Sequence, residues 1–199
     1  MSRLRSFTLE LNPPSDFGPL RSLHEDTVKK ILTESNRMAR KANVDSKQEM
    51  HIVLLTEEMI SVLPHLMEYG SGKFWIDSID DVFEIHILVT PKTGSDSKTR
   101  KEKNSGPAKR TMMSRVLDVF DKIVSRKTDK GDEAEITSWS LGSYIEKLRQ
   151  QGPDSQSDEW DEMEHSILAN LADDVMVRKS GGDVDLVIIK KVQPQDFSF

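Results

Sequence analysis

One segment of alternating side chains constrains the fold of this chain more than any other feature. In KFWIDSIDDVFEIHILVTP, residues 73–91, apolar side chains alternate with polar ones on both sides of the turn-forming SIDD. A period of two predicts a pair of strands, because successive side chains of a strand point to opposite faces. A second pair is predicted in VMVRKSGGDVDLVIIKKV, where a Gly-Gly turn separates two apolar runs. The chain therefore has to build a sheet.

Helical periodicity surrounds these two hairpins. A helix at about 47–68 is predicted to begin at Asp45 or Ser46 as its N-cap, followed closely by Gln48 or Glu49. Pro64 removes a backbone donor, so a kink or an early end is expected there. The remaining expected elements are a strand at 4–11 and helices at about 19–40, at 111–126, in SWSLGSYIEKLRQQ and in MEHSILANLADD. The order is β-α-α-β-β, then loop and helices, then α-β-β.

Length and composition narrow the class of protein. The 199 residues, 36% of them hydrophobic and 31% charged, predict a single domain over 1–199 with solvated loops. No apolar run reaches the roughly 18 residues that span a bilayer, and no signal-peptide run is seen, so we expect a soluble, cytoplasmic protein without membrane partners. The chain has no cysteine, which excludes disulfides and cysteine-held metals, and no metal-ligand spacing is recognised.

Two polar segments interrupt the pattern. Residues 92–110 are rich in Lys and Arg and form an expected basic loop, while residues 152–162 form a possible acidic insertion. The net charge of −6 argues against general nucleic-acid affinity, and the basic loop has no aromatic residue to stack on bases. Nucleic acid is therefore disfavoured as a partner, and the loop is either solvated or a clamp for phosphate or for an acidic partner.

The opening FTLEL, the segment VDSKQEMHIVLLTEEMISVLPH and the closing ILANLADDVMVRKSGGDVDLVIIKKV together resemble the GHKL (histidine-kinase-like) ATPases. They are most similar to the anti-sigma-factor serine kinases of bacteria. The resemblance implies an α/β two-layer sandwich, in which helices cover one face of a mixed sheet. It further implies a nucleotide held between helices and a flexible lid, and pairing into a homodimer.

The motif that holds magnesium and the catalytic base in that family is E-x-x-x-N. Glu58 matches its Glu, which makes Glu58 the candidate base, but Val62 replaces the Asn. A valine cannot coordinate a hard cation that requires oxygen ligands. His65 follows nearly a turn later and is read either as a side chain on the pocket rim or as a substitute ligand. Glu57 and Glu58 also fit a plain reading, in which one is solvated and the other pairs with a lysine.

Two further motifs complete the implied pocket. The D-x-G-x-G motif for adenine falls on TPKTG, where Thr90 replaces the Asp and Gly94 alone matches. The glycine-rich lid over the phosphates falls either on WSLGSYI, with Gly142 and Tyr144 as the matching residues, or on EHSILANL, which lacks the glycines. Both lid alternatives stay open at this point.

These departures predict a regulatory, protein-binding module with a degenerate ATP site, for which no cofactor is expected. The partner implied by the resemblance is a sigma factor or an anti-anti-sigma-like protein. The first alternative is an active protein serine kinase that uses ATP and Mg²⁺, with Glu58 as base. The second is an electrostatic binding module acting through residues 92–115, whose affinity would fall steeply with salt.

Overall fold

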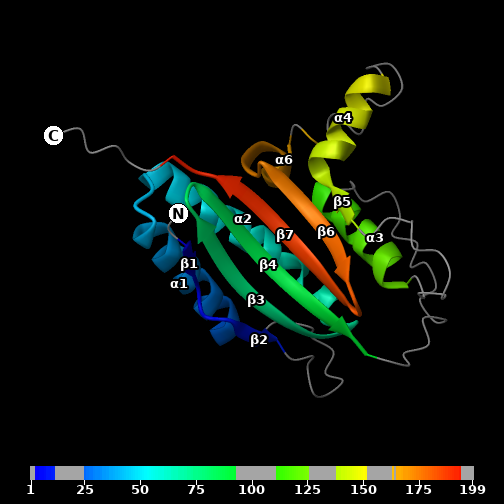
Figure 1. The fold of residues 1–199 in the computed structure, drawn as a ribbon, viewed down its shortest axis with the longest axis horizontal. Coiled ribbons are helices and arrows are strands. Elements are labelled where there is room, and N and C mark those ends of the chain that lie inside the picture. Colours follow the sequence, from blue (N-terminus) through cyan, green and yellow to red (C-terminus); the bar gives the residue numbers. More distant parts are fainter. Residues whose placement is uncertain are drawn as a thin grey trace.

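The computed structural model describes residues 3–11, 25–92, 111–125, 138–151, 163 and 165–193. Within these ranges the chain is a mixed α/β fold of seven strands and five helices (Figure 1). Along the chain they are β1 (Arg3–Arg5), β2 (Leu9–Leu11), α1 (Glu25–Lys41), α2 (Ser46–Leu66), β3 (Gly70–Ile79), β4 (Val82–Pro91), α3 (Met112–Ser125), β5 (Ser138–Ser140), α4 (Leu141–Gln151), α6 (Ile167–Leu171), β6 (Asp174–Ser180) and β7 (Asp183–Lys191).

All described strands join one open sheet. Their order is β1-β3-β4-β7-β6-β5, and β2 pairs with β3 beside β1. Every described pair is antiparallel, so the expectation of a mixed sheet is wrong. The physical reason lies in the connections: β3–β4 and β6–β7 are tight hairpins, which are antiparallel by necessity, and the two hairpins meet through β4 and β7 in the antiparallel sense.

Both predicted hairpins form, and their turns explain their register. Asp80, the first turn residue between β3 and β4, has a φ of 53°, a left-handed conformation that Asp tolerates better than most residues. Gly181 has a φ of 60° between β6 and β7, where glycine avoids steric cost. In the first hairpin Phe74 pairs with Ile87 and Ile76 pairs with Ile85. The apolar sets of the two strands therefore share one face.

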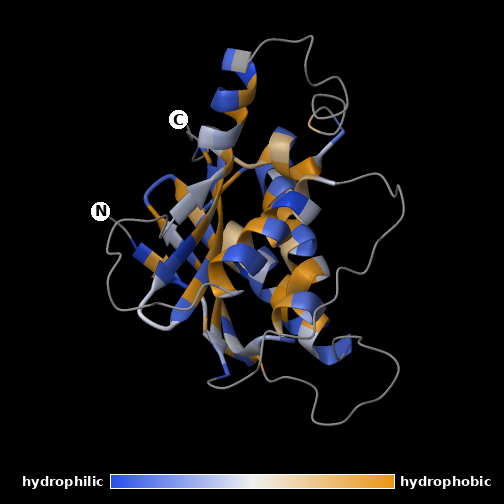
Figure 2. Cartoon of the chain, turned by 90° about the vertical axis from the view of Figure 1, so that its right-hand side faces the viewer, coloured by the Kyte–Doolittle hydropathy of each residue, from blue (hydrophilic) through white to orange (hydrophobic). Residues whose placement is uncertain are grey.

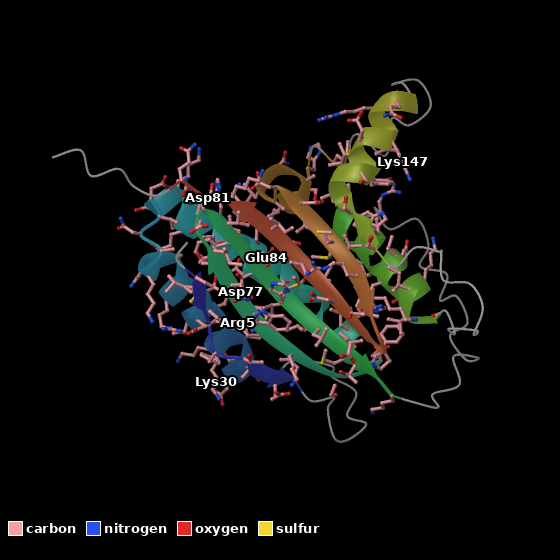
Figure 3. The ribbon with its side chains drawn as sticks, viewed as in Figure 1. Arg5, Lys30, Asp77, Asp81, Glu84 and Lys147 are labelled. Atoms are coloured by element: carbon pink, nitrogen blue, oxygen red, sulfur yellow. The ribbon has the colours of Figure 1, made fainter. Side chains whose placement is uncertain are left out.

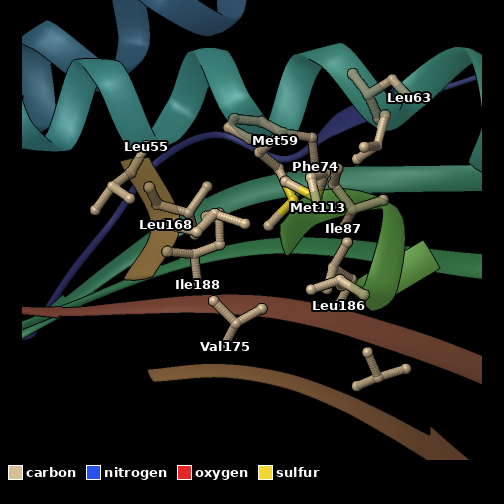
Figure 4. Packing of buried hydrophobic residues seen from close by; sticks show 14 of the residues in the cluster. Leu55, Met59, Leu63, Phe74, Ile87, Met113, Leu168, Val175, Leu186 and Ile188 are labelled. Atoms are coloured by element: carbon tan, nitrogen blue, oxygen red, sulfur yellow. The ribbon is translucent and has the colours of Figure 1, made fainter. Parts of the chain in front are cut away.

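Helix α2 crosses that apolar face of the sheet (Figure 4). Asp45 is its N-cap, because the side chain of Asp45 accepts a 2.8 Å hydrogen bond from the N–H of Gln48. The helix continues through Pro64 and ends at Leu66, two residues later. Helix α1 packs beside α2, and the hydroxyl groups of Ser35 and Thr56 form a buried 2.8 Å hydrogen bond between them.

The hydrophobic core lies between the helices and this face. Figure 2 shows apolar residues gathered where the helices meet the strands. The largest fully buried side chains include Phe74, Phe83 and Phe120, together with Ile52, Leu55, Met59 and Leu63 of α2. The opposite face of the sheet carries the alternate residues of the same strands, and these include Trp75, Asp77, Glu84, His86 and Asp185. Strand pairing thus separates an apolar face from a polar one.

Several boundaries differ from expectation. The predicted strand at 4–11 is two short strands, because Ser6 turns inward between them and its Oγ accepts from the N–H of Ile76 at 2.7 Å. The predicted helix at the start of SWSLGSYIEKLRQQ begins only at Leu141, since Ser138–Ser140 pair with β6 as an edge strand. Among the described residues the predicted closing helix is found as α6, and Asp174, at its expected end, belongs to β6 instead. The segment 152–162 lies outside the described residues.

Candidate functional site

The candidate base and its neighbours lie on α2, at positions four and seven residues apart. This spacing puts Glu58, Val62 and His65 on one side of the helix. Glu58 and His65 are partly exposed, whereas Val62 is 4% exposed and belongs to the buried apolar cluster. That cluster also contains Met113, Val116 and Phe120 of α3. The side of α2 that carries these three residues therefore lies at the border between the core and the solvent.

Val62 occupies the position where the resembled motif has a magnesium ligand. Its side chain has no oxygen or nitrogen and is packed within the core. A hard divalent cation needs several oxygen ligands at defined positions. The Val62 side chain therefore contributes packing energy and cannot act as a ligand.

Glu58 stands in a less polar environment than an ordinary surface carboxylate. Burial, followed by the negative charge of Glu57, raises the pKa of Glu58 above its usual value. Both effects disfavour the ionised form. A carboxylate with a raised pKa is a stronger base, which is the property a catalytic base needs.

His65 is engaged by the neighbouring helix. Its Nε2 lies 2.8 Å from Oδ1 of Asp121 on α3, and the hydroxyl group of Tyr69 donates a 2.6 Å hydrogen bond to the same oxygen. Tyr69 also makes an edge contact with the His65 ring and packs against Phe120. The carboxylate of Asp121 selects which ring nitrogen of His65 carries the hydrogen. These contacts couple the end of α2 to α3.

Thr90 lies near the same end of the molecule. It is exposed near the end of β4 and pairs with Ser71, two residues beyond Tyr69. The N–H of Lys92 donates a 3.0 Å hydrogen bond to the carbonyl of Tyr69. The structure thus brings the end of β4 close to the end of α2. Gly94 lies outside the described residues, as does all of the predicted basic loop apart from Lys92.

Gly142 is in the first turn of α4, at the other predicted part of the pocket. Its N–H donates to Oδ1 of Asp174 at 2.9 Å, and the N–H of Ser143 donates to Oγ of Ser140 at 3.1 Å. A helix N-terminus attracts anions because its first N–H groups lack partners within the helix. In this helix a carboxylate and a hydroxyl group of the chain itself already accept two of those hydrogens. The two segments predicted as alternative lids both contain a helix, α4 in one and α6 in the other. Both lid alternatives therefore remain predictions.

Sequence reasoning did not find Asp121, Tyr69 or Asp174 as members of the site. Asp121 is adjacent in sequence to the core residue Phe120 on an amphipathic helix, where it resembles any solvated residue. Asp174 looked like the end of a helix. The one available signal was the spacing of His65 and Tyr69, four residues apart near the end of the helix.

None of the helices in the described part of the chain combines the length and the apolar character that crossing a membrane requires. Comparison with models of known protein families gives no match, and no curated protein matches the sequence.

Proposed function

We propose that this chain is a regulatory, protein-binding module that keeps the framework of a histidine-kinase-like ATP-binding domain without ordinary Mg-ATP catalysis. The observation that carries the proposal is the burial of Val62 within the core, one helical turn beyond Glu58. A magnesium ion that bridges the phosphates is central to phosphoryl transfer. With an aliphatic side chain at its expected ligand, the triphosphate lacks this counter-charge.

The order of elements supports the framework half of the proposal. An N-terminal strand region, two long helices, a hairpin, further helices and a closing hairpin follow one another as the resemblance implies. Helices α1 and α2 lie together on one side of the sheet, which fits the two-layer sandwich of that family (Figures 1 and 2). By the same resemblance the protein is cytoplasmic and its partner is a sigma factor or an anti-anti-sigma-like protein.

The carboxylate of Asp174 at the start of α4 supports the second part of the proposal, the absence of ordinary Mg-ATP catalysis. If α4 is the lid helix, the phosphate groups would meet the carboxylate of Asp174, which holds the N–H of Gly142 at 2.9 Å. Two anions compete for one donor there, and the carboxylate is already bound. Affinity for a triphosphate is reduced by this repulsion.

Isothermal titration of the full chain with ATP and Mg²⁺ tests the proposal. We expect no saturable heat at concentrations up to about tens of micromolar, the range of a functional nucleotide site. Binding in that range, together with slow hydrolysis of ATP, contradicts the proposal. Titration with ATP in EDTA separates magnesium-dependent binding from weak binding of the nucleotide alone.

A second candidate function is an active protein serine kinase, and the raised pKa of Glu58 is the observation that favours it. In this case Glu58 would accept the proton of the attacking serine hydroxyl group. The matched pair Glu58→Gln and Glu57→Gln tests this function, because Glu57 is the exposed neighbour. Loss of phosphate transfer to a co-purifying partner in Glu58→Gln alone supports the kinase, and equal behaviour of both variants rejects Glu58 as its base.

A further inference from the structure

A compact group of ionisable side chains occupies the face of the sheet opposite α1 and α2. Asp77, Glu84 and His86 each present one potential ligand atom, and these three atoms lie within 4.8 Å of one another. They come from paired positions of β3 and β4, where Asp77 faces Glu84 and Trp75 faces His86. Figure 3 shows Asp77 and Glu84 on this face, with Arg5 of β1 beside Asp77.

Two members of the group are shielded from water, and the third, Glu84, is half-buried. His86 is 4% exposed and Asp77 is 2% exposed. The indole ring of Trp75 stacks on the imidazole of His86, with ring centres 4.5 Å apart and planes inclined by 8°. The guanidinium group of Arg5 in turn lies over the Trp75 ring. A buried imidazole and a buried carboxylate need partners with compensating charge or hydrogen bonds.

Both ring nitrogens of His86 face carboxylate oxygens, so in a neutral ring one nitrogen lone pair faces an oxygen lone pair. Its Nδ1 lies 3.3 Å from Oδ2 of Asp185, and its Nε2 lies 3.3 Å from Oε2 of Glu84. A neutral imidazole has one N–H and one lone pair. Whichever nitrogen carries the hydrogen, the other directs a lone pair at a carboxylate. A cation between that nitrogen and that carboxylate removes the repulsion.

The arginines on this face are committed to the other two carboxylates. Arg5 binds both oxygens of Asp77, at 2.7 and 2.6 Å, and Arg178 binds Oδ2 of Asp185 at 3.0 Å. In the described part of the chain, the ion contact of Glu84 is with His86 and with no arginine or lysine. Among these three carboxylates, Glu84 is therefore the one that no arginine or lysine of the described residues contacts, and it lies on the Nε2 side of His86.

We propose that Glu84 and His86, with Asp77 as the third ligand, bind a divalent first-row transition metal ion such as Zn²⁺ or Mn²⁺. Imidazole nitrogen with carboxylate oxygen suits these ions and disfavours Mg²⁺ and Ca²⁺. Asp185 then accepts the Nδ1 hydrogen of His86 and directs Nε2 toward the metal, as a carboxylate commonly does for a metal-bound histidine.

Arg5 fixes the orientation of the Asp77 carboxylate by hydrogen-bonding to both of its oxygens. Oδ2 of Asp77 also accepts a hydrogen bond from Nε1 of Trp75 at 3.2 Å. Arg3 reaches Asp77 at 3.3 Å and is well exposed, so it can swing into solvent when a metal arrives. Carboxylates that bind metals are themselves commonly hydrogen-bonded. This site is on the far face of the sheet from α2 and does not depend on the proposed function.

Titration of the metal-free full chain with Zn²⁺, and separately with Co²⁺ followed by visible absorption, tests the proposal. We expect one saturable site per chain, loss of binding in His86→Gln and in Glu84→Gln, and a loss of affinity of about 10- to 100-fold in Asp185→Asn. His51→Gln is the matched control, since His51 lies near Lys47 and Lys190 and outside the group. It should bind Zn²⁺ like the parent.

A proton can neutralise the same contact, and nuclear magnetic resonance of the His86 ring nitrogens distinguishes the two cations. Zn²⁺ should shift Nε2 selectively and leave Nδ1 bonded to hydrogen. Two N–H groups on His86 that millimolar Zn²⁺ does not change would overturn the metal site in favour of a protonated imidazole. Undiminished binding in His86→Gln would also overturn it. If that variant fails to fold, Glu84→Gln on the half-buried residue decides in its place.

Discussion

The main-chain N–H of Gly142 donates a 2.9 Å hydrogen bond to Oδ1 of Asp174, a residue 32 positions later in the chain. The same oxygen accepts from the N–H of Val175 at 2.8 Å, so one carboxylate joins the start of α4 to the start of β6. The negative charge also complements the positive end of the helix dipole. The first turn of α4 is therefore held by a charge of the sign that a phosphate would carry.

This contact predicts that Gly142→Ala is tolerated. A Cβ at Gly142 would lie 3.6 Å from Asp174 Oδ1, an ordinary contact, and alanine favours the helix by about 0.5 kcal/mol. Urea denaturation should show unchanged or slightly higher stability. The contrasting variant is Gly70→Ala, whose Cβ would lie 2.0 Å from the carbonyl oxygen of Thr90 and should cost about 2 kcal/mol or more. Equal destabilisation by both changes would show that the Gly142 backbone is constrained.

Placing an amide at position 62, where the resembled motif has Asn, is predicted to destabilise the fold. Val62→Asn places a polar group in the core, and an amide buried without hydrogen-bond partners costs about 2–4 kcal/mol. Val53→Asn on the same helix, where the residue is half-buried, should cost under about 1 kcal/mol. Thermal denaturation compares the two. A stable Val62→Asn protein would mean that the buried amide finds a hydrogen-bond partner.

Glu34 predicts a specific dependence of stability on pH. The hydrogen bonds from Arg37 lower the pKa of this buried carboxyl below its ordinary value of 4.5, against the opposing effect of burial. The contribution of Glu34 to stability is therefore present above about pH 4.5 and is lost as the pH falls through the lower pKa of the folded state. Glu34→Gln should be less stable than the parent at pH 7 by about 1–3 kcal/mol.

The readout for Glu34 is the difference between parent and variant in the urea midpoint, measured from pH 7 down to pH 3, because other carboxyl groups titrate equally in both. That difference should shrink as the pH falls below 4.5. A difference that stays constant across this range would assign the stabilisation to packing and not to charge.

The two arginines of β1 are predicted to contribute unequally. Arg5 makes two short hydrogen bonds to the buried carboxylate of Asp77, whereas Arg3 makes one contact of 3.3 Å. Arg5→Gln should cost about 1–3 kcal/mol, because it leaves a buried charge poorly compensated, and Arg3→Gln should change stability by no more than about 0.5 kcal/mol. Chemical denaturation measures both. Similar effects from the two variants would mean that Arg3 takes over the bidentate position.

Local patterns in the sequence predicted the two hairpins and the start of α2, although several other boundaries were wrong. Alternation around Asp80 and around Gly181 predicted both hairpins, and Asp45 predicted the start of α2, since these features depend on neighbours within a few residues. The mixture of helices and strands along the chain followed from combining such segments, whereas the α/β sandwich was implied by the family resemblance. The sequence alone also shows that Val62 follows Glu58 by four residues. The proposed function is argued from this replacement.

Only the tertiary structure decided which distant residues meet. Asp121 reaches His65 because α3 packs against α2, and Asp185 reaches His86 because β7 pairs with β4 in one particular register. The antiparallel sense of the whole sheet depends on how the two hairpins join, for which no local signal exists. A side chain's partner across a sheet or between helices is set by packing of the entire core, so its identity becomes visible only when the chain is folded.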